Sequence, residues 1–399
     1  MAIKYIKYID KINLKGKRVL IRVDFNVPLD KNKNITDDTR IRSALSTLNY
    51  AIKQDAKIIL MSHLGRPKGK PDPEFSLLPV AKYLSQVLQK KVILAPDCIG
   101  PEVEKLVSEM QPRDILLLEN LRFHPEEEKN DREFGRKLAN LADVYINDAF
   151  GTAHRAHASN VAVVEFVKEF GGGFLMKNEI EYFRKAMVEP ARPLVAIMGG
   201  AKVSEKLDAL ENLIQKVDKI FIGGGMAFTF LKAQGYEVGK SLVEGELIET
   251  AKRILAKAKE RKVALLLPVD CVAAFQLDPR TSTKITSIQE IPPDWMGLDI
   301  GPATQVLFAE SLADAKTIVW NGPMGVFEME PFSKGTFAMV KALAESSALT
   351  IVGGGDTDVA VHKLNAADKI SYISTGGGAF IEILKGKPLP AISVLERTG

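Results

Sequence analysis

Apolar and polar residues alternate along the first half of the chain in a pattern typical of strands that take turns with helices. Short apolar runs predict strands at residues 18–25, 57–61, 92–94, 115–118 and 144–146. Apolar residues with helical spacing predict helices at residues 41–52, 77–88, 102–110 and 126–141. This alternation favours a parallel sheet that is covered on both faces.

Three glycines at residues 171–173 interrupt the pattern. One helix is predicted at residues 179–188, and the alternation then restarts with strands at residues 194–198, 219–222, 264–267, 317–319, 350–352 and 371–373. We therefore expect two doubly wound (Rossmann-like) α/β/α domains, each with a mainly parallel sheet, joined by a linking helix and facing each other across a cleft. The boundaries we predict are 1–173 for the first domain, 174–190 for the linking helix, 191–388 for the second domain and 389–399 for a C-terminal tail.

The composition is that of an ordinary globular protein and argues against several classes. The net charge is small, 54 − 50 = +4, and no long run of basic residues occurs, so we expect no nucleic-acid partner. No segment approaches the roughly 20 apolar residues of a membrane helix, and the polar first residues lead us to expect no signal peptide. The two cysteines, Cys98 and Cys271, form no CxxC pair; we expect reduced core thiols, not metal ligands, in a cytoplasmic protein.

The stretch LTIVGGGDTD at residues 349–358 combines the features of an anion site. A strand pattern runs into three glycines and then into a helical pattern, with Asp356 at the expected N-cap position. Backbone N–H groups and the dipole at a helix N-terminus favour negative charge, and glycine lets the backbone approach a phosphate closely. A plain capped helix would have the same sequence pattern.

The second half repeats this arrangement, and this repetition favours a ligand site. Glycine clusters follow predicted strands at residues 199–200, 223–225, 322–325, 353–355 and 376–378. Five such clusters on one edge of one sheet indicate a surface shaped for a nucleotide and its phosphates.

The first half differs in its chemistry, because basic side chains stand where the second half has glycines. Four of the five histidines lie in the first half, and arginines stand at the ends of predicted strands, at Arg22, Arg66, Arg122 and Arg155. The carboxyl ends of parallel strands build the ligand crevice of such sheets, and arginine matches phosphate or carboxylate oxygens. We therefore predict a basic pocket.

Familiar nucleotide motifs do not account for these features. The segment GYEVGKS at residues 235–241 is one residue short of a P-loop and follows a helix, and GGGMAF at residues 223–228 lacks the last glycine of a dinucleotide fingerprint. A basic pocket in one half and a glycine-lined surface in the other fit phosphoryl transfer, which holds two anionic substrates in line.

Seven segments resemble the phosphoglycerate kinase family, in the family's order and over nearly the whole chain. They are RVDFNVP (22–28), SHLGRP (62–67), LENLRF (118–123), DAFGTAHRAH (148–157), GGAKV (199–203), NGPMGVFE (321–328) and GGGDT (353–357). One departure is Ala158, where the family often has serine; it leaves His154 and Arg155 unchanged.

The resemblance implies the reaction of 1,3-bisphosphoglycerate with ADP to give 3-phosphoglycerate and ATP, with Mg²⁺ as cofactor. It implies triose-phosphate binding by Arg22, Asp24, Asn26, Arg40, His63, Arg66, Arg122, His154 and Arg155. It implies nucleotide binding by Lys202, Lys206, Gly223, Gly297, Asn321, Glu328, Gly353, Gly354, Gly355, Asp356 and Thr357, with Asp356 on the metal. The groups that act on the transferring phosphoryl group would be Arg40, Lys202, Gly354 and Gly377.

The resemblance also implies small-molecule substrates, no membrane partner and a tail that packs back on the first domain. We expect a monomer, and we expect the two domains to close about the linking helix, because water must be excluded from the phosphoryl group. Two alternatives stay open at this point: a catalytically inactive module that binds nucleotide or glycerate phosphates, and a dehydrogenase on a similar fold.

Overall fold

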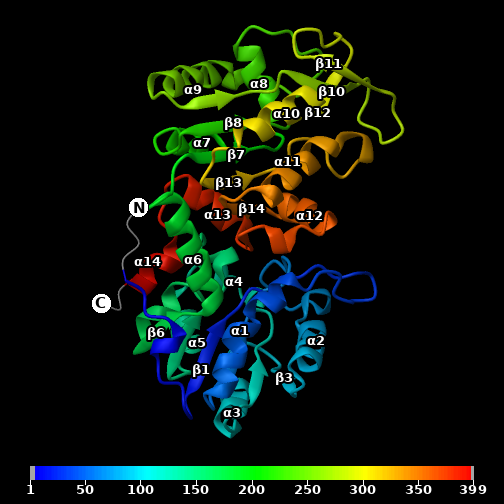
Figure 1. The fold of residues 1–399 in the computed structure, drawn as a ribbon. Coiled ribbons are helices and arrows are strands. Elements are labelled where there is room, and N and C mark those ends of the chain that lie inside the picture. Colours follow the sequence, from blue (N-terminus) through cyan, green and yellow to red (C-terminus); the bar gives the residue numbers. More distant parts are fainter. Residues whose placement is uncertain (1–4, 397–399) are drawn as a thin grey trace. The chain divides into compact units, whose positions relative to one another are not determined.

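The protein is described by a computed structural model over residues 5–396, and its chain divides into two compact units (Figure 1). Of the described residues, the N-terminal unit comprises 5–181 together with 388–396. The C-terminal unit comprises residues 182–387. The boundary between the units falls within helix α6 (Phe174–Met187). Each unit is described separately below.

The N-terminal unit is built on a six-stranded parallel sheet with the order β3-β4-β2-β1-β5-β6. The strands are β1 (Arg18–Arg22), β2 (Lys57–Met61), β3 (Val92–Leu94), β4 (Ile115–Leu117), β5 (Val144–Asn147) and β6 (Glu169–Gly172). The chain starts at β1, builds one side of the sheet, and then crosses to β5 on the other side. The topological switch point therefore lies between β1 and β5, where doubly wound sheets bind ligands.

Helices cover both faces of this sheet because successive strand residues point in opposite directions. Alternate strand residues such as Ile21, Ile58 and Leu117 pack in one core with residues of α1 and α2. Their neighbours Leu20 and Tyr145 are fully buried on the opposite face. The helices are α1 (Thr39–Lys53), α2 (Leu78–Leu88), α3 (Pro101–Glu109), α4 (Pro125–Glu128) and α5 (Arg132–Ala139).

The C-terminal unit repeats the plan with a second six-stranded parallel sheet, in the order β15-β14-β13-β7-β8-β9. The strands are β7 (Leu194–Met198), β8 (Lys219–Ile222), β9 (Ala264–Leu266), β13 (Thr317–Asn321), β14 (Leu349–Gly353) and β15 (Tyr372–Ser374). Here the switch point lies between β7 and β13. Both predicted sheets, and hence the predicted fold class, are confirmed.

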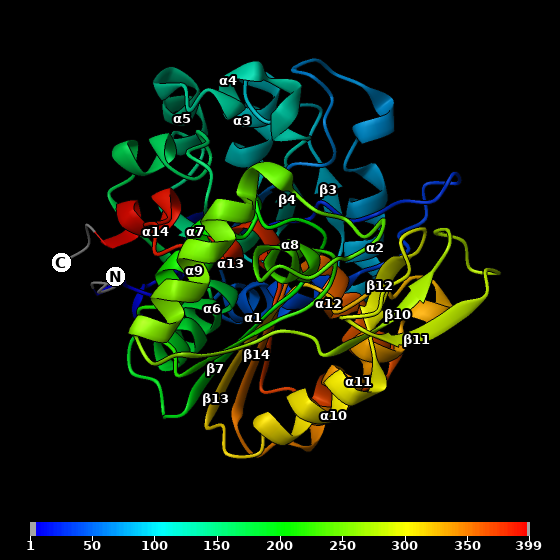
Figure 2. The same cartoon turned by 90° about the horizontal axis from the view of Figure 1, so that it is seen from above.

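Two layers of helices enclose the second sheet. Trp320, Val352 and alternate strand residues pack against α10 (Pro302–Ser311), α11 (Lys334–Glu345) and α12 (Gly355–Lys363) on one face. Figure 2 shows β7, β13 and β14 side by side, with α10 and α11 on one side of them. The remaining helices of the unit are α7 (Leu207–Leu213), α8 (Met226–Ala233), α9 (Ile248–Glu260) and α13 (Gly377–Leu384).

A small antiparallel sheet, which the sequence analysis did not predict, stands beside the parallel sheet of the C-terminal unit. Its strands β10 (Asp270–Ala274), β11 (Thr283–Ser287) and β12 (Met296–Ile300) have the order β11-β10-β12. Polar residues and a β-bulge between Val272 and Ala273 interrupt its apolar alternation.

Three predicted elements differ from the structure for local reasons. Strand β1 stops at Arg22 because the Phe25 N–H donates to the Ser62 Oγ (2.8 Å) instead of continuing the ladder. The helix predicted at residues 126–141 is two helices, because Asn130 has a φ of +53° and Asp131 caps α5 by accepting the Phe134 N–H. The glycines at residues 171–173 do not break the pattern, because the first two belong to strand β6. A Cβ on Gly171 would lie 2.3 Å from the Lys7 carbonyl oxygen, so the close approach of these segments requires glycine.

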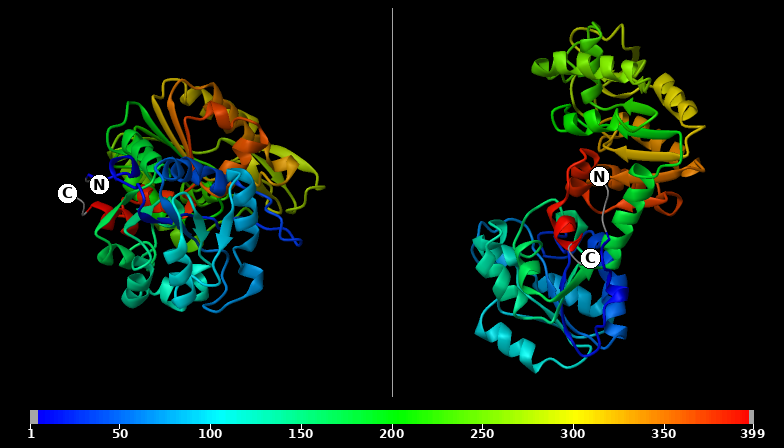
Figure 3. Two further views of the ribbon diagram at one scale, coloured as in Figure 1. Left: turned by 90° about the horizontal axis from the view of Figure 1, so that it is seen from below. Right: turned by 90° about the vertical axis from the view of Figure 1, so that its left-hand side faces the viewer.

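The C-terminal segment belongs to the N-terminal unit. Helix α14 (Pro390–Leu395) is held there by the Ala391 N–H, which donates to the Ala153 carbonyl (3.1 Å). Figure 3 shows this helix in red, next to the end of the chain marked C. None of the helices within residues 5–396 has the length and apolar character needed to span a bilayer.

Candidate functional site

Basic side chains gather at the carboxyl edge of the sheet in the N-terminal unit. Arg22 ends β1, His63 follows β2, Arg122 follows β4 and Arg155 follows β5. Arg22 is fully buried; its Nε donates to the Ser159 Oγ (2.9 Å), and its Nη2 lies 3.3 Å from the His63 Nδ1. The expectation that strand-end arginines share one edge of the sheet is confirmed.

His63 is the centre of this cluster. Burial, together with the charges of four arginines (Arg22, Arg122, Arg155 and Arg40), holds the pKa of His63 well below its ordinary value. The imidazole is therefore neutral at pH 7. The geometry makes it an acceptor for the Arg22 guanidinium, and it adds no charge of its own to the site.

Arg40 projects from the first turn of α1 toward the loop that follows β1. Its Nη1 lies 3.2 Å from the Asp24 carboxylate and donates to the Asn26 carbonyl (3.0 Å). The Asn26 Oδ1 in turn accepts the Gly65 N–H (2.8 Å), which joins this loop to the one after β2. Arg40 keeps 38% of its side chain exposed, so the guanidinium can still bind a ligand.

Asn120, which the sequence analysis did not name as a site residue, fixes the loop that carries Arg122. Its amide group donates to the Leu64 carbonyl (2.7 Å), and its Oδ1 accepts the Arg122 N–H (3.0 Å). The Arg122 Nη1 donates to the Gly65 carbonyl (2.7 Å). The loops after β2 and β4 are thereby locked together by hydrogen bonds between buried polar groups.

A buried carboxylate, Glu127, lies beneath the arginines. It accepts the backbone N–H (2.9 Å) and the hydroxyl (2.6 Å) of Ser159, the residue that also binds Arg22. Burial raises the pKa of Glu127, and the charge of Arg22 opposes that shift. Glu127 also lies 3.7 Å from His157, whose pKa is lowered to about 3 by burial and by nearby arginines.

The remaining predicted residues of this unit lie at the margin of the cluster. The Arg155 Nε lies 3.2 Å from the His154 Nε2. Arg66 is exposed, and within residues 5–396 it has no hydrogen-bond or ion-pair partner. An arginine with no partner is available to an anionic ligand.

In the C-terminal unit, glycine loops line the corresponding carboxyl edge of the sheet, so this edge presents backbone groups instead of side chains. Gly200, Gly224, Gly322 and Gly354 all have positive φ. A Cβ on Gly199 would lie 2.1 Å from the Pro323 carbonyl oxygen, and one on Gly322 would lie 2.3 Å from that of Gly199. The loops after β7 and β13 meet so closely at the switch point that glycine is required. The five predicted glycine clusters all follow strands of this one sheet, as expected.

Side chains tie these loops to the next strand. The Asn321 amide donates to the Gly353 carbonyl (2.8 Å), and the Thr357 hydroxyl accepts the Gly322 N–H (2.9 Å). Lys206 donates to the Asn321 Oδ1, and burial lowers the pKa of this lysine. These hydrogen bonds of Asn321, Thr357 and Lys206 thus fix the loops after β13 and β14 relative to each other.

The first turn of α12 corrects one prediction. The N-cap is Gly354, with a φ of +105°, and Asp356 lies inside the first turn without capping the helix. A glycine can take this backbone conformation and an aspartate cannot do so without strain, so the cap falls two residues earlier. The Asp356 carboxylate is exposed and therefore free to meet a ligand.

A pocket of about 510 Å³ opens beside these glycines. Gly297, Glu328 and Asp356 line it, as do Gly200, Gly224 and Gly225. Its volume suits a small organic ligand. Gly223 lies one residue before the lining glycines and packs on Met324, and Gly377 begins α13 after β15. Lys202 is exposed on the loop after β7.

Sequence reasoning missed the apolar side of this pocket. Leu242, Leu277, Met296, Leu298 and Val326 line it, and Lys240 adds a cation. Two of these residues lie in the unpredicted β12. Lys240 belongs to the rejected P-loop segment, where the following Ser241 accepts the Gly297 N–H (2.9 Å). Apolar walls beside glycine loops suit a flat ring attached to phosphates.

Comparisons with known proteins give a consistent result. Residues 9–387 match the family described as phosphoglycerate kinase. The phosphoglycerate kinase of Geobacter metallireducens is 63% identical over 399 residues, the full length of both chains, and that of Aquifex aeolicus is 56% identical over 98% of each. The solved structure of phosphoglycerate kinase from Coxiella burnetii aligns with a TM-score of 0.90 at 44% identity, covering 98% of this chain and 99% of that one.

Proposed function

The chain belongs to the phosphoglycerate kinase family, and we propose that it transfers a phosphoryl group reversibly from 1,3-bisphosphoglycerate to ADP, giving 3-phosphoglycerate and ATP. The observation that carries this proposal is the pairing of two different anion sites on one chain. One is a cluster of arginines around a neutral histidine, and the other is a glycine-built edge beside a pocket with apolar walls. The family assignment removes the dehydrogenase alternative.

The N-terminal cluster would bind the triose phosphate. Arg22, His63, Arg66, Arg122, His154 and Arg155 would surround its phosphate, and Asp24 and Asn26 would meet its hydroxyl and carboxyl end. Arg40 would turn from Asp24 toward the transferring group. Guanidinium groups suit this role because they keep their charge and offer paired donors to phosphate oxygens.

The C-terminal pocket would bind ADP or ATP. Its apolar wall with Gly297 would take the base, Glu328 would accept hydrogen bonds from the ribose, and the loops with Gly353, Gly354, Gly355 and Thr357 would meet the phosphates. Lys202 and Lys206 would add positive charge, and Lys206 already lies at Asn321. The N–H groups around Gly377 would face the developing charge.

Asp356 fits the role of a magnesium ligand. Its carboxylate is exposed, lines the pocket, and offers the oxygen ligand that Mg²⁺ prefers. When bound with the nucleotide, Mg²⁺ neutralises phosphate charge.

The chemistry would need no general base. The acceptor in one direction is the carboxylate of 3-phosphoglycerate and in the other the β-phosphate of ADP, and both are already ionised. His63 would be neutral throughout, so it would orient Arg22 rather than move a proton. Catalysis would consist of alignment and of charge stabilisation by Arg40 and Lys202.

We further propose hinge closure about α6, because Arg40 and Lys202 belong to different units and would act on one phosphoryl group. X-ray scattering would test this: the radius of gyration should fall when 3-phosphoglycerate and nucleotide are both present. Superimposable curves with and without the two ligands would contradict it. Family membership supports a monomeric cytoplasmic enzyme of glycolysis and gluconeogenesis, and sedimentation would test the monomer.

The direct test mixes the protein with 3-phosphoglycerate, ATP and Mg²⁺ and follows acyl-phosphate formation through a coupled NADH signal. Turnover that stops when any one component is left out is the expected result. Binding of both ligands by calorimetry without turnover would instead identify an inactive binding module.

A further inference from the structure

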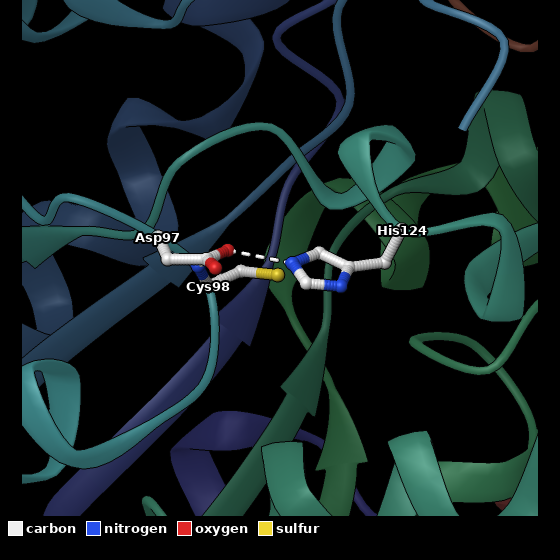
Figure 4. A group of neighbouring side chains, drawn as sticks. All are labelled: Asp97, Cys98 and His124. Carbon is white, nitrogen blue, oxygen red and sulfur yellow. Dashed lines mark hydrogen bonds and ion pairs between the residues drawn. The ribbon is translucent and has the colours of Figure 1, made fainter. Parts of the chain in front are cut away.

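Asp97, Cys98 and His124 converge in the N-terminal unit although they come from separate segments of the chain. Asp97 and Cys98 lie in the loop after β3, and His124 precedes α4. Their ligand atoms all lie within 4.8 Å of one another. Figure 4 shows the carboxylate and the thiol pointing toward the imidazole, with the dashed line joining Asp97 to the ring.

We propose that these three side chains form a binding site for a thiophilic divalent cation such as Zn²⁺. Thiolate, imidazole and carboxylate are the ligands that Zn²⁺ uses in proteins. The proposal is independent of the phosphoryl-transfer site, because none of the three residues has a role there. It also revises the expectation that Cys98 is a core thiol and not a metal ligand: the cysteine is buried as expected, but the fold adds a histidine that the sequence places 26 residues away.

The geometry requires small adjustments to accept a metal. In a tetrahedral zinc site, bond lengths near 2.0–2.3 Å place the ligand atoms about 3.3–3.6 Å apart. The Asp97 Oδ1 and the His124 Nε2 are 2.7 Å apart in a hydrogen bond, so they would separate by less than about 1 Å. The Cys98 sulfur, which lies within 4.8 Å of the other two ligand atoms, would move inward by at most about 1.3 Å. The His124 ring already packs on Phe134, with centroids 5.4 Å apart, which limits its orientation.

Charge and access also fit a dication. A carboxylate and a thiolate supply two negative charges, so the bound site would be neutral. Asp97 keeps 44% and His124 25% of its side chain exposed, which leaves a path for the ion and for a water as fourth ligand. On binding, the sulfur would exchange its proton for the metal, and the proton would leave to solvent.

A reactive thiol is the competing interpretation, and the structure argues against it. Cys98 is fully buried, so its sulfur is not open to a reagent from solvent. The Asp97 carboxylate also meets the imidazole at the Nε2, the end that faces the cysteine, whereas a nucleophilic triad needs the acid on the other ring nitrogen.

A metal here would brace the loop that carries Arg122. The Asp97 carbonyl accepts the Glu119 N–H (3.3 Å), and His124 lies two residues beyond Arg122. In the unbound protein the Asp97–His124 ion pair joins the loops after β3 and β4, and a bound metal would replace it with bonds to three side chains. We therefore expect binding to raise the melting temperature of the protein.

The test titrates chelator-treated, full-length protein with Co²⁺ alone and records its absorption spectrum. The expected result is one Co²⁺ per chain, with a thiolate-to-cobalt charge-transfer band and the intense visible bands of tetrahedral cobalt, all removed by Zn²⁺. Cys98→Ser should abolish the charge-transfer band. Cys271→Ser is the matched control, since Cys271 is the other buried thiol, and it should retain the band.

His124→Gln provides a second variant in case Cys98→Ser fails to fold, because His124 is only partly buried. It should weaken Co²⁺ binding at least about tenfold and remove the Zn²⁺-induced rise in melting temperature. His362→Gln is its control, since His362 is an exposed residue of α12 that forms a comparable ion pair with Asp358 (2.8 Å), far along the chain from either cysteine. No charge-transfer band in the wild type, or equal binding by His124→Gln, would overturn the proposal.

Discussion

The two units share one topology, but different groups line the carboxyl edges of their parallel sheets. Each has a six-stranded parallel sheet with a switch point, between β1 and β5 in one unit and between β7 and β13 in the other. At the first switch point the chain places buried polar side chains, the charged Arg22 beside the neutral His63. At the second it places glycines whose backbones touch, such as Gly199 and Gly322. The same architecture therefore supports two ways of holding an anion.

This difference has consequences for how each site is stabilised. Fixed arginines repel one another, so the N-terminal unit needs a buried counter-charge in Glu127 and a network through Ser159 and Asn120. The backbone-built edge carries no net charge to offset; it needs close packing and unusual φ values. Mutations at these two edges should therefore change stability through electrostatics in the N-terminal unit and through backbone strain in the C-terminal unit.

The largest effect is expected for Arg40→Ala. If Arg40 stabilises the transferring phosphoryl group, its loss should lower kcat by about 10³–10⁵-fold, the range known for an arginine in that role. The affinity for 3-phosphoglycerate should fall much less. Steady-state kinetics in the coupled assay would measure both.

Arg42→Ala is the matched control for Arg40. It lies two residues further along α1, is exposed, and pairs with Asp38 (2.6 Å). We expect kcat to stay within about twofold of the wild type, because an exposed ion pair of this kind contributes little. Equal losses in the two variants would mean that α1 as a whole is disturbed and would remove Arg40 from the mechanism.

Lys202→Ala tests the equivalent cation of the C-terminal unit. A single charge-stabilising donor typically contributes about 10²–10³-fold to kcat, so we expect a loss on the order of 10³-fold with ATP affinity little changed. Lys252→Ala, which removes an exposed lysine paired with Glu249 on α9, should have no measurable effect. A Lys202→Ala enzyme with near-normal kcat would show that the second unit acts through its backbone alone.

Gly354→Ala tests the backbone-built edge directly. The φ of +105° and an Asn321 Nδ2 only 3.0 Å from the added Cβ predict a loss of about 1–3 kcal/mol in the free energy of unfolding. Gly355→Ala is the matched control, since its Cβ would meet nothing within 4 Å and it begins a helix. Urea unfolding of the two variants should separate them clearly. Equal stability would mean that the edge tolerates side chains.

The sequence predicted one kind of feature better than the other. Arginines and glycines at strand ends could be assigned to one edge of each sheet, because parallel strands carry all their carboxyl ends to the same side. Glu127, Ser159 and Asn120 could not be found in this way, since each acts through hydrogen bonds between loops that are distant in sequence. Asparagine and serine are also common in ordinary turns, so residue type alone does not identify such positions.

The apolar wall of the pocket in the C-terminal unit was also beyond reach from the sequence. Met296 and Leu298 lie on β12 of the antiparallel sheet, whose bulge and polar residues hide its period. Asp356 shows a related limit: the sequence pattern placed the N-cap there, but the true N-cap is Gly354 because its backbone has a positive φ. The residue types in the sequence therefore indicated which kinds of group the site contains, but their positions depend on contacts that form only in the folded chain.

The smallest predicted effect concerns one buried aspartate in each unit. It compares how the stability of the two units depends on pH. Asp148 accepts the Met176 N–H of α6 (3.1 Å), and burial raises its pKa to about 7. Asp299 accepts the Gly335 N–H of α11 (2.7 Å), and burial raises its pKa to about 8. Both carboxyls have an ordinary value of 3.8, so the folded state binds the proton more tightly.

The sign follows from this difference in proton binding. The stabilising contribution of each protonated carboxyl is fully present below pH 3.8 and is lost as the pH rises through the folded pKa. Between pH 6 and 8 each group should remove about 1–2 kcal/mol of stability, since one pH unit within this window corresponds to about 1.4 kcal/mol.

Asp148→Asn and Asp299→Asn mimic the protonated acids, so each should flatten the pH-dependent decline in the stability of its own unit. Both tryptophans, Trp295 and Trp320, lie in the C-terminal unit, so tryptophan fluorescence during urea unfolding reports Asp299, while far-ultraviolet circular dichroism reports both units. Asp368→Asn, an exposed aspartate, is the control. If the two buried variants keep the pH slope of the wild type, both carboxyls are ionised in the folded protein. The difference between the arginine-rich edge of one unit and the glycine-rich edge of the other would then not extend to the buried aspartates of the two cores.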